Sequence, residues 1–169
     1  MISRKLCAGL LLITNVLWPI HAFAEGSDNS PLEIALFPPL QVPGTGFGVK
    51  GLRLSVVGKN REVRGIDLAV LGNITDVDFK GIAIAGLFNV NRGLATVTGL
   101  QVAGLANINL GTNKVFGVQI AGYNRAGSVY GIQLGLINIA NDLHGIQIGL
   151  VNFNNNGPFH ISPIINAAF

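Results

Sequence analysis

The chain has 169 residues, of which 49% are hydrophobic and only 11% are charged, with 23 glycines and a formal net charge of +3. So much glycine and so little charge exclude an ordinary helical domain. Without Arg4 and Lys5 of the leader, nine basic residues face eight acidic ones, too balanced for the clustered basic surface that nucleic acid requires. The sole cysteine, Cys7, leaves no disulfide. We expect one domain and no nucleic-acid partner.

Residues 1–24 are typical of a secretory signal peptide. Arg4 and Lys5 precede an apolar run over 6–17, and the Ala-Phe-Ala sequence at 22–24 supplies a small-x-small cleavage site. We therefore expect cleavage after Ala24 and export of the chain. The expected location is the outer membrane or cell surface, with the periplasm as the alternative.

Residues 25–47 are predicted to form a leader and an N-terminal strand or cap. The stretch 32–37 alternates like a strand, and Pro38 and Pro39 end it because proline cannot donate to a sheet ladder. Residues 46–51 satisfy the Gly-x-Gly-x-x-Gly pattern of dinucleotide sites, which needs a helix after it. A strand is expected there instead, so these are interpreted as turn glycines and no cofactor is predicted.

Residues 48–169 are predicted to form a single repeat-built β domain. Seven units start at glycines spaced by 14, 16, 18, 18, 14 and 14 residues, namely Gly51, Gly65, Gly81, Gly99, Gly117, Gly131 and Gly145. We call these the repeat glycines. Apolar and other residues alternate around each of them, which indicates strands of about nine residues. Asn-rich and Gly-rich segments separate the strands, and 58–61 and 124–127 have the composition of hairpin turns.

Two all-β arrangements fit this pattern. An antiparallel meander of about eight strands would close into a small membrane barrel, which removes exposed sheet edges. A parallel β-solenoid with coils of 14–18 residues would stack each repeat position on itself. The apolar pattern on both faces favours the barrel, and the solenoid is the alternative. A large apolar residue six positions after most repeat glycines, such as Leu71 or Leu87, fits a barrel interior poorly.

The second residue after each repeat glycine, here the central position, is predicted to face inward. Arg53 and Asp67 occupy it in neighbouring units and are expected to pair, since a charge away from water is costly unless compensated. The later units carry a belt of amides there, formed by Gln101, Gln119, Gln133 and Gln147. The segment 159–169 ends on Phe169, as the closing strand of an outer-membrane barrel does. Membrane lipid and the outer-membrane assembly machinery are the expected partners.

Three parts of the chain resemble a family of bacterial surface-repeat proteins found as short secreted chains. They are the segment 51–68, the Gly-Ile-Gln-Leu-Gly-Leu-Ile-Asn unit at 131–138, and the ending Asn-Gly-Pro-Phe-His-Ile-Ser-Pro-Ile-Ile-Asn at 156–166. Ala83 departs from the pattern, because it stands where other units have Gln. The resemblance covers nearly all of the mature chain. It implies a place in the cell envelope and supplies no active site.

No catalytic or metal-binding constellation is predicted. His144 shares its repeat position with unrelated residues, and His160 has no Cys, Asp or Glu beside it to complete a metal set. Asp76 and Asp78 flank a turn, but Ca²⁺ requires six to eight oxygens. The expected function is therefore non-enzymatic, with no identifiable small-molecule substrate. It is a structural or surface-interaction role as an outer-membrane barrel, or alternatively binding by a periplasmic or surface solenoid.

Overall fold

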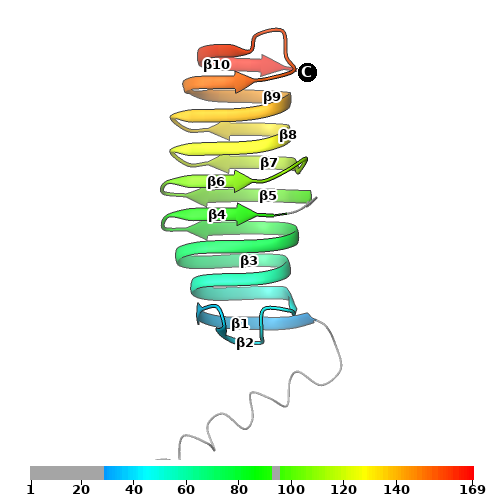
Figure 1. Cartoon of the computed structure of the whole chain (residues 1–169), viewed down its shortest axis with the longest axis vertical. Coiled ribbons are helices and arrows are strands. Elements are labelled where there is room, and N and C mark those ends of the chain that lie inside the picture. The colour runs from blue at the N-terminus through cyan, green and yellow to red at the C-terminus, as the bar shows by residue number, and fades with distance from the viewer. Residues whose placement is uncertain (1–28, 93–95) are drawn as a thin grey trace, which may run out of the picture.

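The computed structural model describes residues 29–92 and 96–169, and these residues form ten strands (Figure 1). The strands are β1 (Asn29–Phe37), β2 (Leu40–Val42), β3 (Gly48–Ala85), β4 (Phe88–Asn91), β5 (Thr96–Ala103), β6 (Ala106–Asn109), β7 (Lys114–Ile120), β8 (Tyr123–Leu134), β9 (Ile137–Asn154) and β10 (Ile161–Ala168). Among the described residues, no helix is long and apolar enough to cross a membrane. The predicted signal peptide at 1–24 lies outside the described residues.

The chain winds as a parallel β-solenoid. One face is built by parallel pairs of β3 with β5, β5 with β7, β7 with β8, and β8 with β9. The other is built by β3 with β4, β4 with β6, and β6 with β8. The long strand β3 contains Gly51, Gly65 and Gly81 and therefore passes through three successive coils, visible as the continuous lower ribbon of Figure 1.

Each coil lies on the previous one in register with the repeat. Gly99 pairs with Gly81 and Gly117, and Gly131 pairs with Gly117 and Gly145. The approach is close: a Cβ on Gly117 would lie 2.0 Å from the carbonyl oxygen of Gly99, and its φ of 141° is open to glycine only. The recurring glycine is therefore a condition of stacking the coils.

The predicted antiparallel barrel is wrong, and the predicted alternative, a parallel solenoid with coils of 14–18 residues, is confirmed. Identical positions in successive units are hydrogen-bonded neighbours running in the same direction, such as Gln119 and Gln133. The inward residues explain this choice, because a column of identical amides can hydrogen-bond along itself only in a parallel, in-register stack. The predicted hairpin turns are also wrong: 58–61 lies within β3, and 124–127 lies within β8.

Antiparallel strands cover both ends of the stack. At the N-terminal end β2 pairs antiparallel with β1, which lies parallel on the first coil. At the C-terminal end β10 pairs antiparallel with β9. Pro163 and Ile164, whose φ is 67°, interrupt the register of β10. A proline and a bulge discourage a further strand from adding to an exposed edge, so the caps limit end-to-end growth.

The interior combines one apolar column with polar ones. The residue two positions before each repeat glycine is apolar and at most 4% exposed: Val49, Val63, Phe79, Val97, Val115, Val129 and Leu143. The central position and the Asn that ends each strand are also buried. Many outward positions are instead aliphatic, so the interior of the coil is unusually polar and its exterior unusually apolar.

Candidate functional site

A glutamine ladder runs through the central position of the later coils. Each Gln amide nitrogen donates to the amide oxygen of the Gln one coil before: Gln119 to Gln101 at 3.0 Å, Gln133 to Gln119 at 2.8 Å, and Gln147 to Gln133 at 2.8 Å. These side chains are at most 1% exposed. Buried amides are stable only when they are paired, and in-register stacking supplies a partner in every coil.

An asparagine ladder lies where each strand leaves the first face. Asn124 donates to the side chain of Asn138 at 2.9 Å and to the carbonyl of Leu134 at 2.8 Å. The same pattern of side-chain bonds runs through six coils, from Asn73 to Asn89, Asn107, Asn124, Asn138 and Asn152. The composition of their segments predicts turns, whereas their recurrence in successive units favours the alternative solenoid, in which Asn stacks on Asn. Their recurrence seven or eight residues after the repeat glycines was the signal that they form a buried column.

The first coils replace the ladder with a charged network. The Arg53 guanidinium donates to both carboxylate oxygens of Asp67, with Nε to Oδ1 at 2.7 Å, and Nη1 donates to Asn60 at 2.7 Å. Asn60 in turn donates to the carboxylate of Glu33, which lies beside Arg53 in the register of β1 on β3. Glu33, Arg53 and Asp67 are each 0% exposed. The structure thus brings Arg53 and Asp67 together and adds Glu33 and Asn60, which the sequence analysis did not identify.

Burial dominates the acid–base chemistry of this network. Desolvation raises the pKa of Glu33 to about 7, against the lowering effects of the Asn60 hydrogen bond and the Arg53 charge. Burial also raises the pKa of Asp67, opposed by the charge and the hydrogen bonds of Arg53. In the described part of the chain, Oε1 of Glu33 has no hydrogen-bond partner. The network therefore has a structural role whose stability depends on pH.

The remaining residues singled out from the sequence do not lie together in one site. Asp76 pairs with Lys59 at 3.5 Å, whereas Asp78 accepts a hydrogen bond from the backbone of Thr96. His144 stacks on Tyr130. Phe169 follows β10 and is 97% exposed. It therefore ends a capping strand and not the closing strand of a barrel. Within the described ranges, no three His, Cys, Asp or Glu side chains group as a metal site requires.

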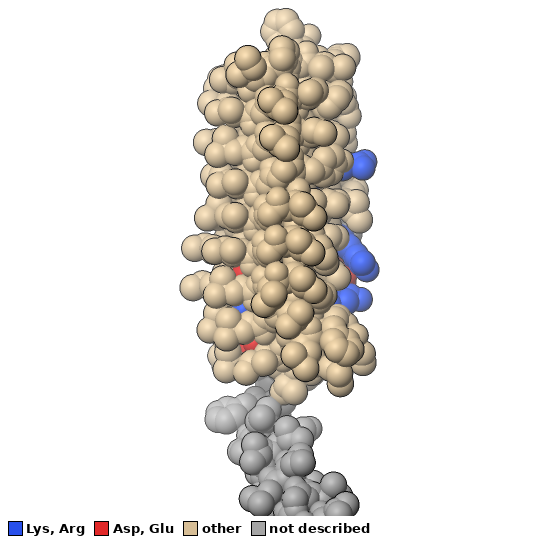
Figure 2. Space-filling view, turned by 90° about the vertical axis from the view of Figure 1, so that its left-hand side faces the viewer, with Lys and Arg blue, Asp and Glu red and all other residues tan. Residues whose placement is uncertain are grey.

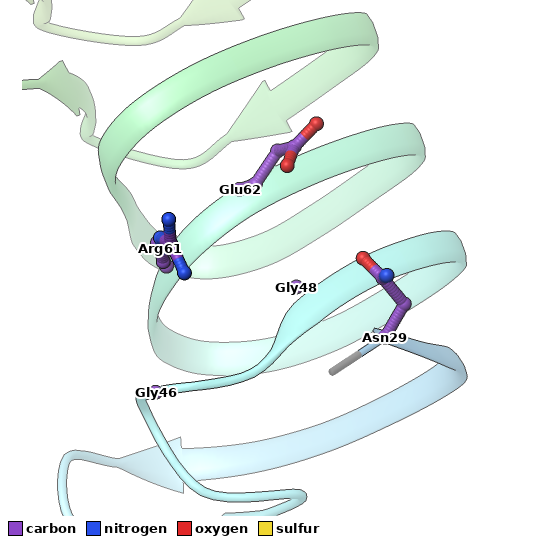
Figure 3. Close-up of a pocket in the computed structure, with 5 residues that line it drawn as sticks. All are labelled: Asn29, Gly46, Gly48, Arg61 and Glu62. Atoms are coloured by element: carbon purple, nitrogen blue, oxygen red, sulfur yellow. The ribbon is translucent and has the colours of Figure 1, made fainter. Parts of the chain in front are cut away.

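A small hollow near the N-terminal cap, of about 160 Å³, contains the Gly-x-Gly-x-x-Gly segment. Gly46 and Gly48 lie where the chain enters β3, so a strand and not a helix follows the motif (Figure 3). Arg61 and Glu62 point away from one another in Figure 3, and Glu62 pairs with Arg64. A dinucleotide site needs a helix N-terminus at this point, and the hollow lacks one.

The largest organised surface is an apolar one, which we call the aliphatic face. It consists of the first residues after the repeat glycines, Leu52, Ile66, Ile82, Leu100, Val118, Ile132 and Ile146, and the third residues, Leu54, Leu68, Ile84, Val102, Ile120, Leu134 and Ile148. Several are well exposed, such as Ile66 at 46% and Ile84 and Ile148 at 44%. The sequence analysis identified both columns as outward but assigned them to a barrel.

Two further columns border the aliphatic face. The residues just before the repeat glycines form the margin column, which changes from cations to aromatic residues along the stack: Lys50, Arg64, Lys80, Thr98, Phe116, Tyr130 and His144. On the other side, where the chain leaves the face, lies the leucine edge, formed by Leu71 within β3, by Leu87, Leu105 and Leu136 on turns, and by Leu150 within β9. Leu105, Leu136 and Leu150 are 62%, 59% and 67% exposed. The misfit of Leu71 and Leu87 with a barrel interior was the signal for this edge.

Charge is segregated around the coil. The described charged side chains outside the core, apart from Lys59, occupy the stretches leading up to the repeat glycines, here the polar edge: Lys50, Arg61, Glu62, Arg64, Asp76, Asp78, Lys80, Arg92, Lys114, Arg125 and Asp142. Figure 2 looks onto the opposite long side, where β5 turns into β6. Its surface is almost free of Lys, Arg, Asp and Glu, with Lys and Arg at the right-hand margin.

Comparisons of the chain with protein-family models, with curated proteins and with solved structures find no match. The surface of the solenoid itself is therefore what indicates its function.

Proposed function

We propose that this protein is a non-enzymatic binding module of the bacterial cell envelope, which holds its partner on the aliphatic face. The segregation of charge carries this proposal. Soluble monomers seldom expose large contiguous apolar patches, and those that do use them to bind proteins, ligands or membranes. Here the two aliphatic columns run over all seven coils, and the leucine edge continues them except in the coil of Gly51 and in that of Gly117, where Gly122 takes its place.

The interior supports a binding role over a catalytic one. The described buried polar side chains largely engage one another, as Arg53 does with Asp67 and Gln133 does with Gln119. A nucleophile or general base needs a positioned partner and room for a substrate beside it. The buried columns leave no such room, and they make the coil a stiff support for its outer surface.

Placement in the cell envelope is supported by two features of the sequence. The first is the predicted signal peptide at 1–24, and the second is the resemblance to secreted surface-repeat proteins. An exported chain with an apolar side would be held at the envelope by that side. The aliphatic face and the proposed location are therefore consistent with one another.

Envelope retention tests the proposal. A leucine-edge variant, Leu105→Ser, Leu136→Ser and Leu150→Ser, should move from the envelope to the soluble fraction. Hydrophobic contact is not screened by salt, so the wild-type chain should stay with the envelope in a high-salt wash. The matched control is a polar-edge variant, Arg92→Ser, Lys114→Ser and Arg125→Ser, which should be retained. Equal distribution of all three proteins would contradict the proposal, provided that circular dichroism shows each one folded.

A further inference from the structure

We infer that the partner of the aliphatic face is a lipid surface with anionic head groups, which the leucine edge enters and the margin column holds at the head-group level. This inference rests on the proposed function. Three observations carry it: the chemistry of the face, the shape of the leucine edge, and the composition of the margin column.

The side chains of the aliphatic face have no hydrogen-bond donors or acceptors for a partner to satisfy. Every one of its outward side chains is Leu, Ile or Val. Its strands are paired on both sides within the stack, as β7 is with β5 and β8, so the backbone groups of inner coils are already bonded. Contact with hydrocarbon is tolerated only when backbone polar groups are satisfied internally. The face meets this condition, and acyl chains require no hydrogen bonds in return.

The leucine edge is convex, which distinguishes a fluid partner from a second copy of the chain. Leu105 and Leu136 lie on turns between strands and Leu150 lies within β9, and all three are more than half exposed along one long side of the solenoid, the side facing the viewer in Figure 2. A specific dimer needs closely matched surfaces of about 800 Å² on each partner. Two convex ridges touch along a line only, whereas acyl chains mould themselves around a ridge. The shape therefore favours lipid.

The margin column supplies the polar boundary. Its side chains point to the same side of the sheet as the aliphatic face, because residues two apart on a strand share a face. Lys50, Arg64 and Lys80 are exposed cations, and no Asp or Glu occupies the column. Farther along, Tyr130 stacks between Phe116 and His144 with centroid distances of 4.8 and 4.5 Å. Basic side chains attract anionic head groups, and aromatic residues concentrate at the membrane interface.

These features together define an orientation. The leucine edge lies deepest, the aliphatic face rests against the acyl chains, and the margin column stays at the boundary. The rest of the polar edge, outside the margin column, remains in water, where Arg92 and Lys114 keep their hydration. Interfacial segments of this kind enter to a depth of roughly 5–10 Å, which suits a solenoid lying on its side better than one that spans the bilayer.

Flotation with vesicles tests the inference directly. The exported protein, without its predicted signal peptide at 1–24, should float with vesicles of phosphatidylcholine and phosphatidylglycerol in equal parts, and more weakly with phosphatidylcholine alone. The margin variant Lys50→Gln, Arg64→Gln and Lys80→Gln should lower affinity for the anionic vesicles by about 100-fold, while affinity for the neutral vesicles stays unchanged. Unchanged binding of the margin variant to anionic vesicles would overturn the head-group assignment.

Tryptophan placement tests the orientation. The only tryptophan of the full chain is Trp18, within the predicted signal peptide, so the exported protein gives a background without tryptophan. On this background, Leu136→Trp on the leucine edge should shift its emission to the blue with vesicles and be quenched by brominated acyl chains. Thr112→Trp, exposed on the opposite side of the coil, should show neither effect. Equal quenching of the two probes would contradict the orientation.

The results separate failure of this inference from failure of the proposed function. If the protein does not float with vesicles of either composition while the leucine-edge variant still leaves the envelope, the partner is another macromolecule and the lipid inference is overturned. A blue shift of Leu136→Trp that grows with protein concentration in the absence of vesicles would assign the face to a second copy and overturn it equally. If the protein does not float with vesicles and the leucine-edge variant stays with the envelope, both the lipid inference and the proposed function are wrong.

Discussion

The early and late coils of the solenoid fill the same inward position with different chemistry. In β1 and the first two coils it holds Glu33, Arg53 and Asp67, and from Gln101 onward it holds only amides. Ala83 lies between the two regions and contributes no polar side chain. An amide column can be lengthened coil by coil because each new Gln brings one donor and one acceptor. A charged column cannot, since each ion must find its counterion in the same few coils.

The same division appears on the surface. The margin column carries Lys50 and Arg64 in the coils of the charged network, Lys80 in the coil of Ala83, and Phe116, Tyr130 and His144 in the coils of the amide ladder. The early coils are therefore held by specific electrostatic pairing, and the late coils by repetition. Four predictions, taken from the largest expected effect to the smallest, separate these two kinds of stabilisation.

Asp67→Ala should be the most damaging, because it leaves the Arg53 guanidinium buried without its counterion. Breaking a buried pair from one side costs about 3–5 kcal/mol. The double variant Arg53→Gln with Asp67→Gln gives the early coils the chemistry of the late ones and should recover most of the free energy of unfolding. Urea denaturation measures both. If the double variant is as unstable as Asp67→Ala, the loss of stability does not come from the unpaired charge of Arg53, which would contradict this prediction.

The early coils should also make stability depend on pH. The folded-state pKa of Glu33 is about 7 against an ordinary 4.5, so the folded state binds the proton more tightly than the unfolded state. Stability is then greatest below about pH 4.5 and falls as pH rises toward 7, by up to about 3 kcal/mol. Asp67, whose pKa is also raised, acts in the same direction. Glu33→Gln should flatten the curve of unfolding free energy against pH, and an unchanged slope would exclude Glu33 as its source.

Within the late coils, Gln133→Ala should cost more than Gln147→Ala. Gln133 is bonded to Gln119 and Gln147, so its removal leaves an acceptor and a donor without their ladder partners. Gln147 ends the ladder, so its removal breaks a single ladder bond, to the Gln133 oxygen, together with a part-buried bond to the Phe153 carbonyl. The expected costs are about 2 and about 1 kcal/mol beyond the shared loss of packing. Thermal unfolding of the two variants compares them, and a reversed order would mean that the ladder is not cooperative.

The smallest effects should come from the margin column. Tyr130→Ala removes two stacked contacts, at 4.8 and 4.5 Å, and should cost about 1 kcal/mol. Arg64→Ala removes only an exposed ion pair with Glu62 and should leave stability unchanged within error. A urea midpoint that shifts for Arg64→Ala but not for Tyr130→Ala would reverse the assignment of electrostatic and packing roles at the surface.

The repeat and its strands were predictable from the sequence because alternation and a recurring glycine are local signals. The identity of the inward position was predictable too, since Arg53, Asp67 and Gln119 alternate with aliphatic residues. The choice between barrel and solenoid was not, because Gly-x-Gln-x-Gly reads the same in both chain directions. Only the partners across the stack distinguish the two folds, and those partners are long-range.

The residues that were not predicted from the sequence were missed for similar physical reasons. Glu33 lies before the first repeat glycine, and its place beside Arg53 depends on how β1 docks on β3. Asn124 and its counterparts have the composition of turns, and turn propensity concealed their part in a ladder. Leu71 and Leu87 disagreed with the barrel for a physical reason, since they belong to an outward edge that the barrel does not possess.

Both the ladders and the aliphatic face depend on parallel, in-register stacking of the coils, and spin labels on paired cysteines can measure that register. Labels at Tyr130→Cys and His144→Cys should lie on adjacent strands and give a strongly broadened spectrum, because these residues are paired neighbours. Leu150 lies six residues farther along the chain than His144, the stacking partner of Tyr130. Labels at Tyr130→Cys and Leu150→Cys should therefore lie about 20 Å apart and show little broadening. An antiparallel meander centred on Gln133 and Gln147 would place 130 opposite 150. Broadening of the second pair and not the first would therefore contradict the solenoid and the functions proposed for it.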